Sequence, residues 1–213
     1  MAHGTISGRE AGGNLFPELC ARRTPAELEI GGFMGFRTEQ RGNEVTISNG
    51  KIMLAYDLKT GKARAEGENG ITLSGIDSAV KLSDGTVYSS TGPNQEGRKA
   101  VIQEIQDGFG TGKQLTVSKV HADGRTLFQR FYIYEELPYL ISEVSIKGRE
   151  QIGSNEITVL KAETAAFPEG EDMRFLFTPF DNDDFVRYAA LPFSEIRESY
   201  EMSAVYDANS RNL

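Results

Sequence analysis

Short runs of alternating apolar and polar residues dominate the chain from Glu44 onward. These runs are rich in Val, Ile, Thr, Tyr and Phe and are separated by Gly, Asp and Asn, a pattern typical of β-strands joined by turns. Helical patterns are scarce, because the segments near Glu27 and Ser194 lack an apolar stripe longer than a turn or two. The pattern therefore predicts an all-β fold with few short helical turns.

Three segments predict β-hairpins with a glycine in the turn. Residues 52–57 and 62–66 are joined by a loop that contains Gly61, and the other two turns contain Asp84-Gly85 and Asp123-Gly124. Glycine adopts the positive φ that such short turns need. Three hairpins of one kind predict an antiparallel meander.

The segment 126–134 (TLFQRFYIY) predicts a strand with large apolar groups on both faces, since successive side chains of a strand point to opposite sides. The two sets are Leu127, Phe131 and Ile133, and Phe128, Tyr132 and Tyr134. A strand of this kind belongs inside a layered structure. With further strands predicted at 139–147, 156–163 and 199–207, the expected architecture is a large antiparallel β-sandwich.

The two ends of the chain differ from its centre. Residues 1–31 mix Gly, Ala, Arg and Pro without periodicity, which predicts a poorly ordered lead-in before one sandwich domain over 32–213. We find no apolar core of a secretory signal and no stretch long enough to span a bilayer, so no membrane partner is expected and the cytoplasm is favoured. The last predicted strand runs almost to Leu213, so we expect the chain to stop inside a larger architecture.

Charge and cysteine content exclude several kinds of site. A net charge of -8 argues against nucleic acid, which requires clustered Lys and Arg. Cys20 is the only cysteine, so neither an intrachain disulfide nor a thiolate metal site can form. His121, in the turn sequence HADG, has no second His or Cys nearby and is expected to be solvated.

The segment 107–114 (DGFGTGKQ) resembles a phosphate-binding loop only in part. Asp107 stands where such a loop needs its first glycine, and Gln114 stands where it needs Ser or Thr. The segment also leads into an apparent strand, so no helix amino terminus would face a phosphate. It predicts a flexible hairpin loop.

The segment 175–188 (FLFTPFDNDDFVRY) is the main candidate for chemistry. Six carboxylates and one Arg174 lie between Glu169 and Asp184, and such crowding is unfavourable unless solvent, a cation or hydrogen-bond donors relieve it. Four hypotheses follow: a solvated loop, an irregular calcium site, a catalytic carboxylate pair or a sugar contact.

The spacing of residues after Asp181 excludes one form of the calcium hypothesis, an EF-hand, and none of the other three hypotheses. An EF-hand that began at Asp181 would need Gly and Glu where Val186 and Pro192 stand. Phe180, Phe185 and Tyr188 flank the acids as rings that can cover the apolar face of a sugar. Aromatic residues beside a loop are also common core anchors, so the four hypotheses stay open on the residues alone.

Four segments of the second half form an ordered series. They are RFYIYEELPYLISEVSIKG (130–148), GSNEITVLKA (153–162), PFDNDDFVRY (179–188) and SYEMSAVYDANSRN (199–212). In order and spacing the series resembles the amino-terminal domain of bacterial alpha-galactosidase-like enzymes of glycoside hydrolase family 36. The resemblance covers most of 44–212.

This resemblance implies a β-supersandwich that precedes a (β/α)8 barrel. In that family the barrel carries both catalytic aspartates and hydrolysis retains configuration, so no catalytic residue, metal or cofactor is assigned here. The sandwich covers and completes the sugar pocket, and in some members it contributes to homo-oligomer contacts. The positions expected at the rim of the pocket are Asp181, Asn182, Asp183, Asp184, Phe185 and Arg187.

The resulting hypothesis is a non-catalytic domain that helps a barrel in the same polypeptide act on a terminal α-galactoside or a related sugar. A first alternative is an autonomous carbohydrate-binding module. A second is a structural or oligomerisation domain whose acidic segment is solvated surface.

Overall fold

The computed structural model describes residues 35–93, 97–149, 153–179, 188–196, 198–199 and 202–209. Its regular elements in these ranges are antiparallel β-strands and one short 3₁₀ turn, η1 (Phe193–Glu195), which confirms the predicted all-β fold. The lead-in predicted for 1–31 lies outside the described residues. Within the described part of the chain, no helix is long and apolar enough to cross a membrane.

The larger sheet has the strand order β1-β2-β3-β4-β5-β11. Strand β5 also pairs with β6 and β12, because its eleven residues are long enough to serve successive neighbours along each edge. The bounds are β1 (Arg37–Arg41), β2 (Glu44–Ser48), β3 (Ile52–Asp57), β4 (Lys62–Gly67), β5 (Thr72–Leu82), β6 (Val87–Ser89), β11 (Ser154–Lys161) and β12 (Thr164–Ala166).

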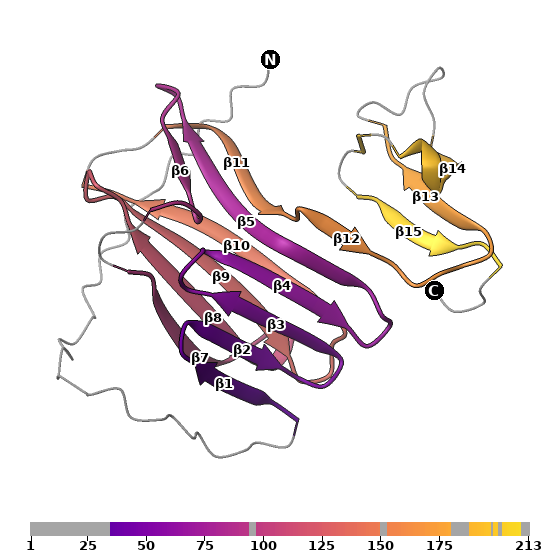
Figure 1. The fold of residues 1–213 in the computed structure, drawn as a ribbon, viewed down its shortest axis with the longest axis horizontal. Helices are drawn as coiled ribbons and strands as arrows, with labels where there is room; N and C mark the ends of the chain where they lie inside the picture. Colours follow the sequence, from indigo (N-terminus) through magenta and orange to yellow (C-terminus); the bar gives the residue numbers. More distant parts are fainter. Residues whose placement is uncertain are drawn as a thin grey trace.

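The second sheet has the order β10-β9-β8-β7 and lies behind the larger one in Figure 1. Its strands are β7 (Lys99–Asp107), β8 (Gly110–Val120), β9 (Thr126–Tyr134) and β10 (Leu140–Lys147). A small third sheet, beyond β12 in Figure 1, has the order β14-β13-β15. It consists of β13 (Met173–Phe177), β14 (Ala189–Pro192) and β15 (Ala204–Asp207).

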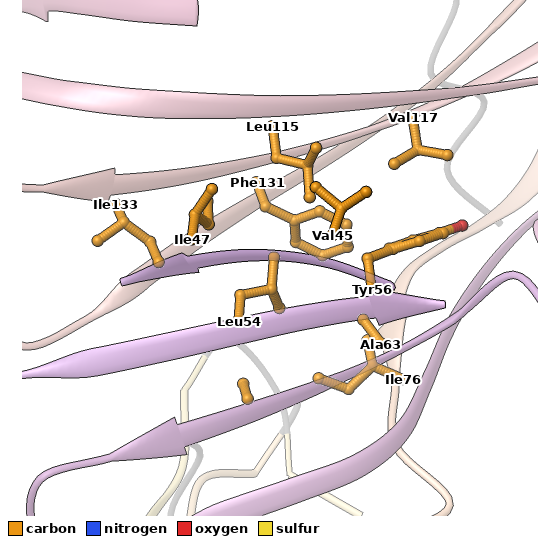
Figure 2. Close-up of a cluster of buried hydrophobic side chains, with 11 residues drawn as sticks. Val45, Ile47, Leu54, Tyr56, Ala63, Ile76, Leu115, Val117, Phe131 and Ile133 are labelled. Atoms are coloured by element: carbon orange, nitrogen blue, oxygen red, sulfur yellow. The ribbon is translucent and has the colours of Figure 1, made fainter. Parts of the chain in front are cut away.

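The main core lies between the two large sheets. Figure 2 shows side chains from β2 and β3 meeting side chains from β8 and β9. The fully enclosed residues with the largest volume include Tyr56, Phe131, Ile47, Leu54 and Ile133. Burying such residues supplies the main stabilising free energy of a sandwich.

Strand β9 lies inside the sandwich, as its pattern predicts, but its two faces have different environments. The odd-numbered side chains, including Phe131, are buried in the core, whereas the even-numbered ones up to Tyr132 are half-buried. On that outer face Arg130 lies 5.3 Å from the ring centre of Phe128. The guanidinium of Arg130 thus covers part of the Phe128 ring on this face.

The three predicted hairpins are confirmed as β3-β4, β5-β6 and β8-β9, with Gly61, Gly85 and Gly124 at φ of 78, 87 and 83°. The loop predicted at 107–114 is much shorter than expected. Asp107 pairs with Gly110 across a two-residue turn, and the remaining residues belong to β8. The backbone pairing of β8 with β7 continues without a break from Gln114 to Gly110, so the hairpin is confirmed and the flexible loop is wrong.

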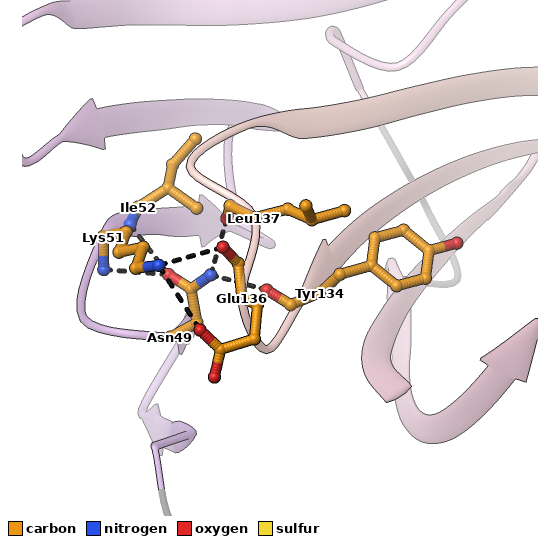
Figure 3. A network of polar contacts seen from close by, with 6 residues as sticks. All are labelled: Asn49, Lys51, Ile52, Tyr134, Glu136 and Leu137. Carbon is orange, nitrogen blue, oxygen red and sulfur yellow. Dashed lines mark hydrogen bonds and ion pairs between the residues drawn. The ribbon is translucent and has the colours of Figure 1, made fainter. Parts of the chain in front are cut away.

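Asn49 joins the β2-β3 turn to the β9-β10 turn (Figure 3). Its Nδ2 donates to the carbonyls of Tyr134 and Leu137, at 2.6 and 2.8 Å. Its Oδ1 accepts the backbone N–H groups of Lys51 and Ile52, at 2.9 and 2.8 Å. One buried side chain therefore closes its own turn and ties the two layers together.

A chain of buried hydrogen bonds crosses the core. Tyr56 donates to Oε1 of Gln129 at 2.5 Å, and Nε2 of Gln129 donates to Ser78 at 2.9 Å. Ser78 then donates to the carbonyl of Val159 in β11 at 2.6 Å. Burial raises the pKa of Tyr56 well above its usual value, so the phenol remains a neutral donor.

Candidate functional site

The rim residues predicted from the resemblance fall between β13 and β14. Asp181, Asn182, Asp183, Asp184, Phe185 and Arg187 lie outside the described residues. The strands on either side form an antiparallel pair in which Phe177 lies opposite Ala189, and Tyr188, directly after the segment, is exposed. The predicted sugar rim therefore stays a prediction.

Two described acids near this segment, Asp172 and Asp207, accept hydrogen bonds from nearby donors. Asp172 accepts two bonds from the guanidinium of Arg174, at 2.6 and 2.9 Å. Asp207 accepts the backbone N–H groups of Asn209, Asp172 and Glu171, which lower its pKa. Among the described residues, no three His, Cys, Asp or Glu side chains come together as a metal site.

A cavity that the sequence patterns did not predict lies beside the β3-β4 loop. Its volume is about 580 Å³, and it is bounded by this loop and by residues that follow β6. The side chains around it that carry polar or charged groups are Asn43, Lys59, Thr60, Lys62, Thr91 and Arg98. All three charged groups among them are cationic.

Arg98 holds the two walls of this cavity together. The residue is only 8% exposed, and four hydrogen bonds fix its guanidinium. The acceptors are the backbone carbonyls of Ser90 at 2.8 Å, Leu58 at 3.0 Å, Lys59 at 2.9 Å and Gly92 at 2.9 Å. Burial lowers the pKa of Arg98, although the guanidinium remains charged at neutral pH.

Lys119 is a second buried cation in the same region. The residue is 6% exposed, and its ammonium donates to the carbonyl of Ser89 at 2.9 Å and to that of Thr91. Burial, followed by the positive charge of Arg98, lowers the pKa of Lys119 to about 8. Both cations therefore order the segment after β6 through neutral acceptors.

His121 departs from the predicted solvated turn. It is half-buried, and its ring meets that of Tyr88 edge to face, with ring centres 5.0 Å apart. Its Nε2 is buried without a hydrogen-bond partner in the described part of the chain. Burial, followed by the charge of Lys119, lowers the pKa of His121, so the expectation of solvation is wrong.

The outer face of the four-stranded sheet carries a second group of polar side chains. We call it the outer polar patch; it consists of Gln103, Gln114, Arg130, Tyr132, Glu143 and Ser145. Glu143 accepts 2.7 Å bonds from both Arg130 and Tyr132, and Gln103 donates to Gln114. The patch combines the half-buried ring of Tyr132 with amide and charged groups, of which Gln114 is only 7% exposed.

No family model, curated protein or solved structure matches this chain. Function must therefore be inferred from the fold and from the chemistry of the side chains.

Proposed function

We propose that the chain is a non-catalytic β-sandwich domain of an alpha-galactosidase-like glycoside hydrolase, which helps to shape the sugar pocket of a barrel in the same polypeptide. The supporting observation is the position of the family-36-like series on the strands. Residues 130–148 include most of β9 and all of β10, 153–162 include β11, and 199–212 include β15. Three of the four segments thus coincide with antiparallel strands, of which β9, β10 and β11 belong to the two large sheets and β15 to the small third sheet.

The acidic segment between β13 and β14 gives this proposal its chemistry. In the proposal, the carboxylates of Asp181 and Asp183 accept hydrogen bonds from sugar hydroxyls, and Asn182 both donates and accepts. Phe185 covers an apolar ring face, as aromatic side chains commonly do in sugar sites. Catalysis belongs to the barrel, and the ligand is a terminal α-galactoside or a related sugar.

The test uses the parent polypeptide that contains the barrel. The double variant Asp181→Asn, Asp183→Asn should raise KM for nitrophenyl α-galactoside several-fold and change kcat little, because the lost contacts hold the ground state and the transition state alike. The matched control is Glu169→Gln, Glu171→Gln, which removes two nearby charges before β13. Equal effects of the two double variants, or clear turnover by the present chain alone, would defeat the proposal.

A second candidate is an autonomous carbohydrate-binding module, favoured by the outer polar patch. A ring such as Tyr132 flanked by amides and a Glu–Arg pair offers stacking and hydrogen bonds to one sugar. Calorimetry with galacto-oligosaccharides should then give saturating heat that Tyr132→Ala abolishes. Ile157→Ala, at an exposed position of β11, should leave it unchanged. Absence of saturating heat in the unsubstituted chain counts against this candidate.

A further inference from the structure

The cavity beside Arg98 has the size and the charge of a site for a small anionic molecule. Its volume of about 580 Å³ lies within the range of small-molecule sites. Among the described residues, no Asp or Glu lines it, whereas Lys59, Lys62 and Arg98 do, in a chain of net charge -8. We propose that this cavity binds the oxyanion, carboxylate or phosphate, of a small ligand.

Arg98 provides a fixed cation that forms no ion pair with a described residue, although the charge of Asp57 acts on it. Its four acceptors are neutral carbonyls, which satisfy N–H groups without neutralising the charge. A guanidinium has five N–H donors, so one on Nη2 has no acceptor in the described part of the chain. Buried charges are most stable when paired, and guanidinium groups pair well with carboxylate and phosphate.

The carboxylates on neighbouring segments already have other partners. Asp57 accepts the backbone N–H of Lys59 and the hydroxyl of Thr60, both at 2.8 Å, within its own turn. Glu163 forms an ion pair with Lys62, so Lys62 exchanges this carboxylate for the oxyanion when the ligand binds. Since Lys119 adds a further buried positive charge bonded only to carbonyls, the electrostatic field in this region favours an incoming anion.

The three cationic groups of the cavity have distinct roles in this site. Arg98 is rigid, because four bonds hold it, and it presents its remaining N–H to one oxygen of the ligand. Lys59 lies on the β3-β4 loop and Lys62 at the start of β4, where their ammonium groups, each with three rotatable N–H donors, can reach the other oxygens. The hairpin loop thereby sets the spacing of the site.

Calorimetry at pH 7 and constant ionic strength tests the proposal on the whole chain. The probes are inorganic phosphate, galacturonate as a carboxylate and galactose as an uncharged control. We expect saturating heat with at least one anion and none with galactose, and the anion that binds identifies the source of the oxyanion. Lys59→Gln and Lys62→Gln should each weaken that binding roughly tenfold, the usual worth of a lost charge-assisted hydrogen bond.

The matched control is Lys81→Gln on β5. Lys81 also faces a glutamate, Glu156, at 3.7 Å, but it does not line the cavity. This variant should bind as the unsubstituted chain does, and all three variants should keep its melting temperature within a few degrees. The proposal is overturned if neither anion binds saturably, if galactose binds equally well, or if Lys81→Gln weakens binding as much as the cavity variants do.

Discussion

Asn49→Ala tests how much the hydrogen bonds between the β2-β3 turn and the β9-β10 turn stabilise the fold. The substitution removes four hydrogen bonds. Two of them reach the carbonyls of Tyr134 and Leu137, which belong to the other large sheet and its β9-β10 turn. Each such bond contributes about 1 kcal/mol net, and a buried carbonyl left without its donor costs about 1–3 kcal/mol. Since bonds made by one side chain are not additive, we expect a loss of about 2–4 kcal/mol in the free energy of unfolding.

Urea unfolding measures this loss as a lower transition midpoint at an unchanged slope. The matched control is Asn69→Ala in the β4-β5 turn, where Oδ1 accepts only the backbone N–H of Ile71, at 3.2 Å and exposed. This control should lose less than about 1 kcal/mol. Similar losses in the two variants would refute a stabilising role for the contact between layers and leave only a local turn effect.

Three further substitutions address the core and its charges. Phe131→Ala should cost about 3–5 kcal/mol in urea unfolding, whereas Val101→Ala, 58% exposed, should stay within about 0.5 kcal/mol; a small loss at Phe131 would contradict its burial. Tyr56→Phe should cost about 1–3 kcal/mol, because Gln129 Oε1 loses its donor, and a neutral effect would show that the chain of bonds is dispensable. For Lys119, whose pKa falls from 10.5 to about 8, the unfolded state holds the proton more tightly, so stability should rise as pH increases from about 8 toward 10. Urea titrations across this window should show the rise flattened in Lys119→Met, and an identical rise in that variant would contradict the assignment.

Local patterns predicted the hairpins because their causes are local. Alternation sets which side chains can be buried together, and a glycine such as Gly85 permits the turn whatever the rest of the chain does. The same alternation places Gln129 on the buried face of β9, but it does not explain why a polar side chain is buried there. Its partners, Tyr56 and Ser78, come from other strands, 73 and 51 residues away, so no window along the sequence contains the three together.

The two candidate sites differ in how a sequence can reveal them. The acidic segment 181–184 attracts notice because its charged side chains are contiguous, whereas Arg98 follows a polar stretch and has the pattern of a solvated residue. Its burial depends on backbone carbonyls, which every residue type supplies, so the site has no signature in side-chain types. Gly61 is required for two reasons. Its positive φ closes the hairpin, and a Cβ there would collide with the Ser90 carbonyl and the Arg98 guanidinium. The turn pattern accounts for the first constraint, and only the fold, which brings Arg98 against that turn, accounts for the second.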